Sequence, residues 1–506
     1  MMSEEAISGC LPFGIASGGI WCRKEPMKQL TLLLIAAMAL AGCGKKTPPA
    51  EAENKAKPKV ATNKPETPEG KLKQSEPKPG SVDFSAHWHQ WRGPLGNGLA
   101  PKGDPPVRWS ETTNIKWKVA IPGSGSATPI VWGNQIFVVS AIKTDRKPKK
   151  IAGQDQPGGR RFGGRMSTPT PTTLYQFVIL CLDRTTGKTL WQKVAAEEVP
   201  HAGHHPSHGY ASASPITDGK NLYVSFGSRG VFCYDLKGNF KWKRNFGDMR
   251  IKVGFGEGTS PALHGDSLIV NWDHEGASFI TSLNAKTGKE IWRKPRSEAT
   301  TWATPLIVEH EGRMQVITNG RTRTRSYDLA TGELLWQCGG MTGNPIPTPV
   351  TRDGTAYLMT GFRGYALYAI PLSARGDLTG TDKIIWQRNQ DTPYVASPLL
   401  YDNLLYFTKE RTGMIACAEA ATGKVHFSGE RLADIRTIYA SLVGAAGKVY
   451  VTGRGGTIVV LKHGPKYEVL ATNKLGEGID ASPVIVGKEL ILRGQKHLYS
   501  IANPKP

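Results

Sequence analysis

The sequence predicts an all-β fold, an eight-bladed β-propeller of four-stranded blades. Its first sign is a repeat in which a small residue, followed by proline in all but one copy, opens a strand. Successive openings are mostly 41 to 49 residues apart, the length of a four-stranded blade. The eight openings lie at Thr128, Ser214, Ser260, Thr304, Thr348, Ser397, Ser441 and Ser482.

A second repeated element closes each unit. It is a glycine-containing hairpin turn followed by a large apolar residue, as in D-R-T-T-G-K-T-L-W. The last unit runs out of chain before this element, and N-I-K-W-K-V-A (114–120) can supply it from the other end. We therefore expect an N-terminal strand to complete the last blade and leave no open edge. The expected blade-closing residues are Trp117, Trp191, Trp242, Trp292, Trp336, Trp386 and Phe427, with Leu470 in the following copy.

One unit is longer than the others. The excess is residues 143–173, which are polar, basic and rich in glycine, and we interpret them as a mobile insertion between two strands of the first blade. Cys181, Cys233 and Cys417 occupy equivalent places in separate units. They should be small buried core residues, too far apart to form disulfides with one another.

The N-terminal region has the features of an export signal. Residues 1–43 hold an extension and a signal peptide in which Met27 is the expected start, and Leu40-Ala41-Gly42-Cys43 resembles a bacterial lipobox. Cys43 is the expected lipidation site, with a simple signal peptide or a retained anchor as alternatives. Residues 44–86, rich in Lys, Pro and Glu, read as a disordered tether before the propeller at 87–506. We expect an exported, lipid-anchored protein that faces the periplasm, with the outer membrane favoured over the inner.

The closing pattern D-x-x-T-G-K/E-x-x-W, combined with the S-P and T-P openings, resembles the pyrroloquinoline-quinone-like (PQQ-like) propeller repeats from about Trp88 to the C-terminus. H-W-H-Q-W-R-G-P-L-G-N-G (87–98) is similar to the lead-in of bacterial exported members, which are often labelled by similarity to the propeller lipoprotein of outer-membrane barrel assembly. This repeat serves both quinone-dependent dehydrogenases and non-enzymatic scaffolds, so the resemblance predicts the fold more sharply than the function.

The enzymatic alternative is a PQQ-dependent dehydrogenase that oxidises an alcohol or a sugar. The resemblance implies a planar quinone bound with Ca²⁺ by carboxylate and amide ligands, and a tryptophan that stacks on it. Asp273 and Glu275 in W-D-H-E-G are the best carboxylate candidates, and Trp302 is the stacking candidate. The adjacent cysteine pair of many such alcohol dehydrogenases does not occur in this sequence. No cofactor is firmly predicted.

The loops between the second and third strands of the blades carry cations in six of the seven loops that can be aligned. Loops at this end of a propeller surround its channel, so the cations should focus positive potential on an anionic ligand. Residues 87–506 carry an excess of 19 positive charges, and a merely basic surface is the plain alternative. The expected contacts are Arg229, Arg321, Arg323, Arg363, Lys409, Arg411, Arg454 and Arg493, with Asp273, His274 and Glu275 in the seventh loop and Tyr394 and Tyr439 nearby.

The stretch H-A-G-H-H-P-S-H-G-Y (201–210) concentrates four histidines in one loop of the same face. His204, His205 and His208 could bind a transition metal together with His274 or Asp273. The spacing matches no strong zinc signature, however, and adjacent histidines diverge in an extended segment. We favour a hydrogen-bonded structural or ligand-contact loop.

The leading hypothesis is a monomeric, non-catalytic binding or scaffolding module. It would recognise an envelope protein or an anionic polymer or glycan on its basic loop face, and it would touch the membrane only through its lipid anchor. The exported location disfavours nucleic acid, although the charge alone would permit it. A weaker third reading is participation in barrel assembly by strand addition at a blade edge.

Overall fold

The computed structural model describes residues 83–148 and 168–504. Within these ranges, no helix is both long enough and apolar enough to cross a membrane. The signal peptide, the Cys43 lipidation site, nearly all of the tether and most of the insertion lie outside the described residues. The sequence-based expectations for those segments therefore stay predictions.

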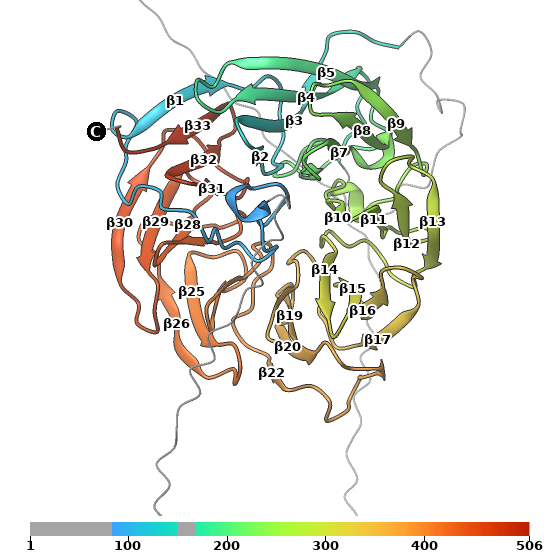
Figure 1. Cartoon of the computed structure of the whole chain (residues 1–506), viewed down its shortest axis with the longest axis vertical. Helices are drawn as coiled ribbons and strands as arrows, with labels where there is room; N and C mark the ends of the chain where they lie inside the picture. The colour runs from blue at the N-terminus through green and yellow to red at the C-terminus, as the bar shows by residue number, and fades with distance from the viewer. Residues whose placement is uncertain (1–82, 149–167, 505–506) are drawn as a thin grey trace, which may run out of the picture. The chain divides into compact units, whose positions relative to one another are not determined.

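Eight antiparallel sheets are arranged in a ring around a central axis, which confirms the predicted eight-bladed propeller (Figure 1). In each blade the first strand lies nearest the axis and the last strand lies at the periphery. Blade 1 consists of β2 (Ile130–Trp132), β3 (Gln135–Lys143), β4 (Tyr175–Asp183) and β5 (Thr189–Glu198), and blade 2 of β6 (Ile216–Thr217), β7 (Asn221–Ser225), β8 (Val231–Asp235) and β9 (Phe240–Arg244). Blade 3 consists of β10 (Ala262–His264), β11 (Ser267–Trp272), β12 (Phe279–Asn284) and β13 (Glu290–Pro295), and blade 4 of β14 (Leu306–His310), β15 (Arg313–Thr318), β16 (Thr324–Asp328) and β17 (Leu334–Cys338).

The second half of the ring repeats this arrangement. Blade 5 consists of β18 (Val350–Arg352), β19 (Thr355–Thr360), β20 (Ala366–Pro371) and β22 (Trp386–Arg388), and blade 6 of β23 (Leu399–Tyr401), β24 (Leu404–Thr408), β25 (Met414–Glu419) and β26 (Val425–Arg431). Blade 7 consists of β27 (Val443–Ala445), β28 (Lys448–Thr452), β29 (Thr457–Lys462) and β30 (Val469–Lys474), and blade 8 of β31 (Val484–Val486), β32 (Glu489–Arg493), β33 (His497–Ile501) and β1 (Ile115–Ala120). β1 pairs antiparallel with β33, with Trp117 opposite Ser500, so the outer strand of blade 8 comes from the N-terminal side of the propeller.

The Ser or Thr that opens each blade has a tertiary role. Its hydroxyl accepts a hydrogen bond from the backbone N–H of the opening residue in the preceding blade, at 2.8 to 3.2 Å. Seven of the eight possible links form, and Thr128 accepts from Ser482 to close the circle. The repeated Ser or Thr therefore links neighbouring blades by a hydrogen bond around the axis. Each link joins buried groups, where an unmade hydrogen bond is costly.

The blade-closing tryptophans make a second set of links at the periphery. The indole N–H of Trp242 donates to Ala285 O of the next blade, and that of Trp292 donates to Leu329 O, both at 2.9 Å. Trp117, Trp191 and Trp386 donate to equivalent carbonyls. The closing position thus combines apolar burial with one directed hydrogen bond, which explains why an indole recurs there.

The seam between blades 4 and 5 lacks both links among the described residues. Thr348 Oγ1 and Trp336 Nε1 are buried there without a hydrogen-bond partner. A short strand, β21 (Gly376–Asp377), instead crosses from blade 5 and pairs in parallel with β17 of blade 4. This strand gives blade 4 a fifth strand and provides a different connection across the seam.

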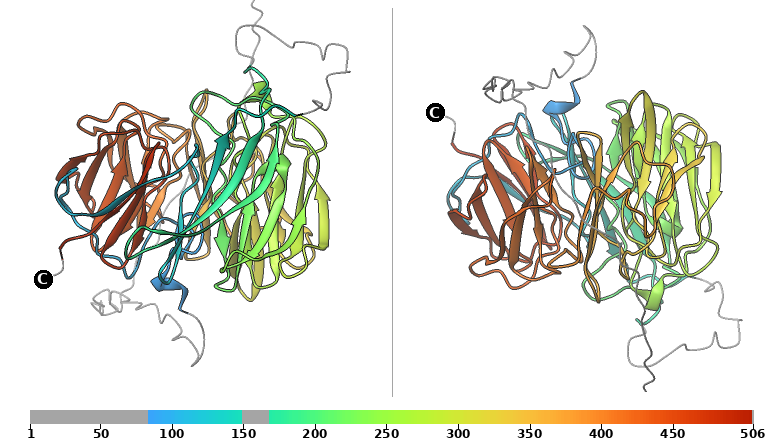
Figure 2. Two further views of the ribbon diagram at one scale, coloured as in Figure 1. Left: turned by 90° about the horizontal axis from the view of Figure 1, so that it is seen from above. Right: turned by 90° about the horizontal axis from the view of Figure 1, so that it is seen from below.

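The lead-in before β1 crosses one end of the central channel. It begins with the short 3-10 helix η1 (Phe84–Ala86), and Trp88, which is fully buried, pairs with Val131 of blade 1. Arg92 follows, 1% exposed, and its guanidinium donates to Leu442 O and Pro398 O on the far side of the ring. In the edge-on views the blue lead-in emerges on one face of the blades (Figure 2).

Burial and chain connection agree with two further expectations. Cys181, Cys233 and Cys417 are buried as free thiols, and so is Cys338. The extra residues of the first blade lie between the paired strands β3 and β4, because β3 ends at Lys143 and β4 begins at Tyr175.

Candidate binding face

The face opposite the lead-in is formed by two kinds of loop, those between the second and third strands of each blade and those that join one blade to the next. Antiparallel pairing brings both kinds to the same end of the sheets. We call this end the loop face. It carries η2 (Gly227–Arg229) and η3 (Lys252–Gly254), together with every cation that the sequence suggested for ligand binding.

Several of those cations form ion pairs or hydrogen bonds with other groups of the protein. Arg229 is 9% exposed and forms ion pairs with Glu198 at 2.6 Å and Asp248 at 2.5 Å. Arg493 is 3% exposed and donates to Ala127 O. These internal contacts bury most of both side chains and leave little of either guanidinium for a ligand. Their carboxylate and carbonyl partners come from the end of β5 and from blade-to-blade connections, which the repeat pattern could not reveal.

Three more cations have carboxylate partners but stay partly accessible. Arg454 binds Asp480 through two nitrogens and lies over the ring of Tyr439 at 4.5 Å. Lys409 pairs with Asp391 at 3.1 Å, and Arg323 pairs with a carboxylate of the β21 strand. The cations in these loops therefore do not all present free positive charge to a ligand.

A shorter set of unpaired cations lies on consecutive blades. Arg321, Arg363 and Arg411 are exposed on the loops of blades 4, 5 and 6, and no carboxylate among the described residues comes within ion-pair distance of them. Lys252, on the loop between blades 2 and 3, lies near Arg321 and Arg363. We call these four residues the cationic arc.

The loops that carry the arc are held firmly. Glu298, whose side chain is fully buried, accepts hydrogen bonds from the N–H groups of Thr322 and Arg323 and from the Arg325 guanidinium. This fixes the turn that presents Arg321. On the next loops, the Tyr365 hydroxyl donates to Glu410 at 2.6 Å, beside Arg411. Pre-ordered loops lose little conformational entropy when a ligand binds.

The residues proposed for a calcium–quinone site do not fit that group. The side chain of Asp273 is fully buried, and its two oxygens accept from Arg296 at 2.8 and 3.0 Å, so they are committed to a structural ion pair. Glu275 accepts from the hydroxyl and N–H of Thr300. Trp302 is 9% exposed, and its indole N–H donates to Gly256 O. A buried arginine beside Asp273 disfavours a cation there, and Trp302 has little exposed surface to offer a planar ligand.

The histidine loop is tied into the loop face by hydrogen bonds. His204 Nδ1 contacts His205 O at 2.9 Å, and His205 Nδ1 contacts the Ser207 hydroxyl at 2.7 Å. The buried ring of His274 accepts from the N–H of Arg250. Across the described residues, no three His, Cys, Asp or Glu side chains converge as metal ligands, so the structure does not assemble the proposed set from His204, His205, His208 and Asp273.

His208 and Tyr439 show how the histidine loop packs against its neighbours. Burial lowers the pKa of His208 to about 4, and the N–H of Gly209 donates to its Nδ1 at 2.8 Å. The Tyr439 hydroxyl lies 3.4 Å from Ser207 Oγ, although Tyr439 follows Ser207 by 232 residues. The histidine loop, which connects blades 1 and 2, therefore reaches toward the connection between blades 6 and 7.

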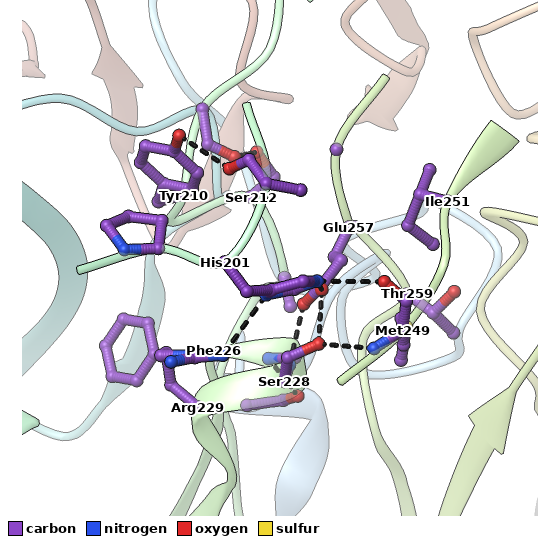
Figure 3. Close-up of a pocket in the computed structure, with 18 of the residues that line it drawn as sticks. His201, Tyr210, Ser212, Phe226, Ser228, Arg229, Met249, Ile251, Glu257 and Thr259 are labelled. Carbon is purple, nitrogen blue, oxygen red and sulfur yellow. Dashed lines mark hydrogen bonds and ion pairs between the residues drawn. The ribbon is translucent and has the colours of Figure 1, made fainter. Parts of the chain in front are cut away.

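A small hollow lies beneath this loop, around Glu257 (Figure 3). Its cavity volume is about 50 Å³, enough for a few water molecules and well below a typical site for an organic ligand. The Glu257 carboxylate accepts from the N–H and hydroxyl of Ser228, and His201 lies 3.7 Å away. Burial raises the pKa of Glu257 against these hydrogen bonds. Gly227 has a φ of 54°, and a Cβ there would overlap the carboxylate, so glycine is required.

Sequence reasoning missed three residues of this face. Lys252, Glu257 and Asn344 lie in blade-to-blade connections that follow no repeat. Their importance depends on what they contact, and only the charge of Lys252 could have drawn attention to it.

Comparisons with known proteins place the chain in a family. The family profile described as outer membrane protein assembly factor BamB matches residues 175–429. No curated protein sequence matches the chain.

The solved structures with a similar fold include the following three. BamB from Moraxella catarrhalis is 12% identical, with 76% of this chain and 98% of that chain covered and a TM-score of 0.50. Quinohemoprotein alcohol dehydrogenase from Comamonas testosteroni is 11% identical over 85% and 83% of the two chains, with a TM-score of 0.58. A europium-containing methanol dehydrogenase is 11% identical over 82% and 90%, with a TM-score of 0.55. The profile match spans half of the sequence, so the chain belongs to the BamB-like family of PQQ-like propellers.

Proposed function

We propose that this protein is a non-catalytic binding or scaffolding module of the cell envelope, which recognises an acidic protein partner through its loop face. The observation that carries the proposal is the cationic arc. Arg321, Arg363 and Arg411 have no carboxylate partner among the described residues, whereas neighbouring cations of the same face do. Exposed arginines on ordered loops suit the recognition of carboxylates, because the guanidinium can donate two parallel hydrogen bonds.

Family membership and the sequence support the location. BamB-like relatives suggest an exported envelope protein, and we propose anchoring through a lipid on Cys43, with the outer membrane favoured. The protein would act as a monomer, held near the membrane by residues 44–86. An anionic polymer or glycan is the alternative ligand for the same arc.

The test is capture of a partner from envelope extracts by photo-cross-linking from a residue beside the arc. The double variant Arg363→Glu/Arg411→Glu should lose the cross-linked partner at an unchanged melting temperature, because both side chains are exposed. Lys220→Glu/Lys488→Glu is the matched control, since these exposed lysines lie in hairpin turns at the opposite end of the blades. Equal capture by both double variants would refute the proposal.

The quinone-dependent dehydrogenase keeps support from the fold likeness to the two dehydrogenases. It is tested by titrating the full chain with pyrroloquinoline quinone, with and without Ca²⁺. We expect no calcium-dependent binding, because Asp273, Glu275 and Trp302 are engaged elsewhere. Tight calcium-dependent binding would reverse this conclusion and redirect attention to other residues of the channel.

A further inference from the structure

Lys252 is the member of the cationic arc with the most defined surroundings. Its N–H donates to Thr300 Oγ1 and its Nζ donates to Asn344 Oδ1, both at 3.0 Å. Asn344 is 3% exposed, and its Nδ2 lies 3.2 Å from the hydroxyl of Tyr394. The ammonium is thus positioned by a neutral amide, and an ammonium has three N–H donors, so two can still reach a ligand.

Like charges are gathered around this ammonium. Burial lowers the pKa of Lys252, the nearby Arg321 and Arg363 lower it further, and Glu275 only partly opposes them. Three different loops bring Lys252, Arg321 and Arg363 together here, and their positive charges repel one another. An anion that enters among them relieves this repulsion and gains charge-assisted hydrogen bonds.

The backbone around the site is strained. Val253, Asn344 and Arg363 all have positive φ, at 53°, 51° and 55°. For a β-branched residue such as Val253 this conformation is a genuine outlier, and such strain gathers at ligand-binding segments. Val253, which directly follows Lys252, also exposes an apolar side chain, with 46% of it accessible.

Aromatic surface completes the site. The rings of Phe362 and Tyr394 lie 4.8 Å apart on neighbouring loops, and the Arg363 guanidinium lies over Phe362 at 5.4 Å. Cations beside apolar and aromatic side chains are the composition of a protein-binding surface. A glycan or a polyphosphate would use the charge and leave Val253 exposed to water.

We propose that Lys252, Arg321 and Arg363 form a carboxylate-binding subsite for an acidic peptide segment that also carries an apolar side chain. Asn344 and Tyr394 position Lys252, and Val253 and Phe362 contact the apolar residue. The subsite rests on the proposed function, since it specifies the chemistry of the partner. It spans the seam between blades 4 and 5, where both regular blade-to-blade links are absent among the described residues. Bound peptide should therefore also stabilise the ring.

The experiment is a calorimetric titration of the full chain at low salt with the blocked peptide acetyl-Glu-Leu-Glu-Phe-Glu-amide. The same peptide with glutamine in place of glutamate is the matched probe. We expect the acidic peptide alone to bind and to raise the melting temperature. Lys252→Met should weaken binding about 10-fold or more, the loss of one charge-assisted contact. Asn344→Gly, which tolerates the positive φ, should weaken it less, and Lys220→Met should leave it unchanged.

Four outcomes would overturn the subsite. They are no binding of the acidic peptide, equal binding of the glutamine peptide, binding that is indifferent to Lys252→Met, and tighter binding of heparin or polyphosphate than of the peptide. Failure here can be told apart from failure of the proposed function. Partner capture that depends on Arg363 and Arg411 without peptide binding would overturn the subsite alone. Peptide binding without any captured partner would refute the scaffold and leave the subsite standing.

Discussion

His208 should make the protein lose stability in mild acid. Its ring is packed against Gly256 and Gly258 on the loop face, and its Nδ1 accepts a hydrogen bond from the N–H of Gly209. Burial lowers its pKa from 6.5 to about 4. A histidine with a depressed pKa in the folded state binds its proton more readily when unfolded, so its contribution is present above pH 6.5 and is lost as pH falls toward 4.

The size of the effect follows from the shift. A lowering of the pKa from 6.5 to about 4 corresponds to about 3 kcal/mol. The His208 residue keeps some exposure to solvent, so we expect a loss of about 2 to 3 kcal/mol in the free energy of unfolding between pH 7 and pH 4. At pH 5 the loss in the free energy of unfolding should be about 1 to 2 kcal/mol, because pH 5 lies between the unfolded and folded pKa values of His208.

The assay is equilibrium unfolding in urea at several pH values between 7 and 4, for wild type and His208→Asn. Asparagine can still accept from Gly209 but does not titrate, so the difference between the two proteins isolates the one group. His264→Asn, at an exposed position on β10, is the control and should follow wild type. The reasoning is refuted if wild type and His208→Asn lose equal stability across this interval.

Three further predictions address the fold and the anchor. Thr128→Val should lower the free energy of unfolding in urea by about 1 kcal/mol or more, because it removes the hydroxyl that accepts from Ser482 N–H. Thr348→Val should lower it clearly less, because that hydroxyl has no hydrogen-bond partner. Equal losses would contradict the role of these hydroxyls in linking the blades. Arg296→Met should lower the free energy of unfolding by about 3 to 5 kcal/mol, because it leaves Asp273 buried and unpaired. The double variant Arg296→Met/Asp273→Leu should recover most of this loss. No recovery would argue against an isolated pair. Cys43→Ser should abolish incorporation of labelled palmitate and release the protein from the membrane fraction, and continued membrane association would favour a retained anchor.

The candidate calcium–quinone residues show where the sequence alone stops being informative. Asp273, Glu275 and Trp302 have the residue types that such a site uses, and they lie in neighbouring blade regions. Arg296, which neutralises Asp273, lies 23 positions later and belongs to no repeated motif. A carboxylate that is a ligand in one environment is a structural ion pair in another, and the difference depends on what folds against it.

The sequence by itself determined the architecture. The Ser/Thr-Pro openings, the glycine hairpins and the closing tryptophans are local patterns that recur at a fixed spacing, and each predicts the same blade. Only the tertiary structure decided which side chains are free to act. Arg229 and Arg363 occupy similar places in the repeat, yet Glu198 and Asp248 bind one and no described carboxylate binds the other. Repeats fix where a loop lies because strand pairing is local, whereas the partner of a charge comes from whichever loop packs beside it.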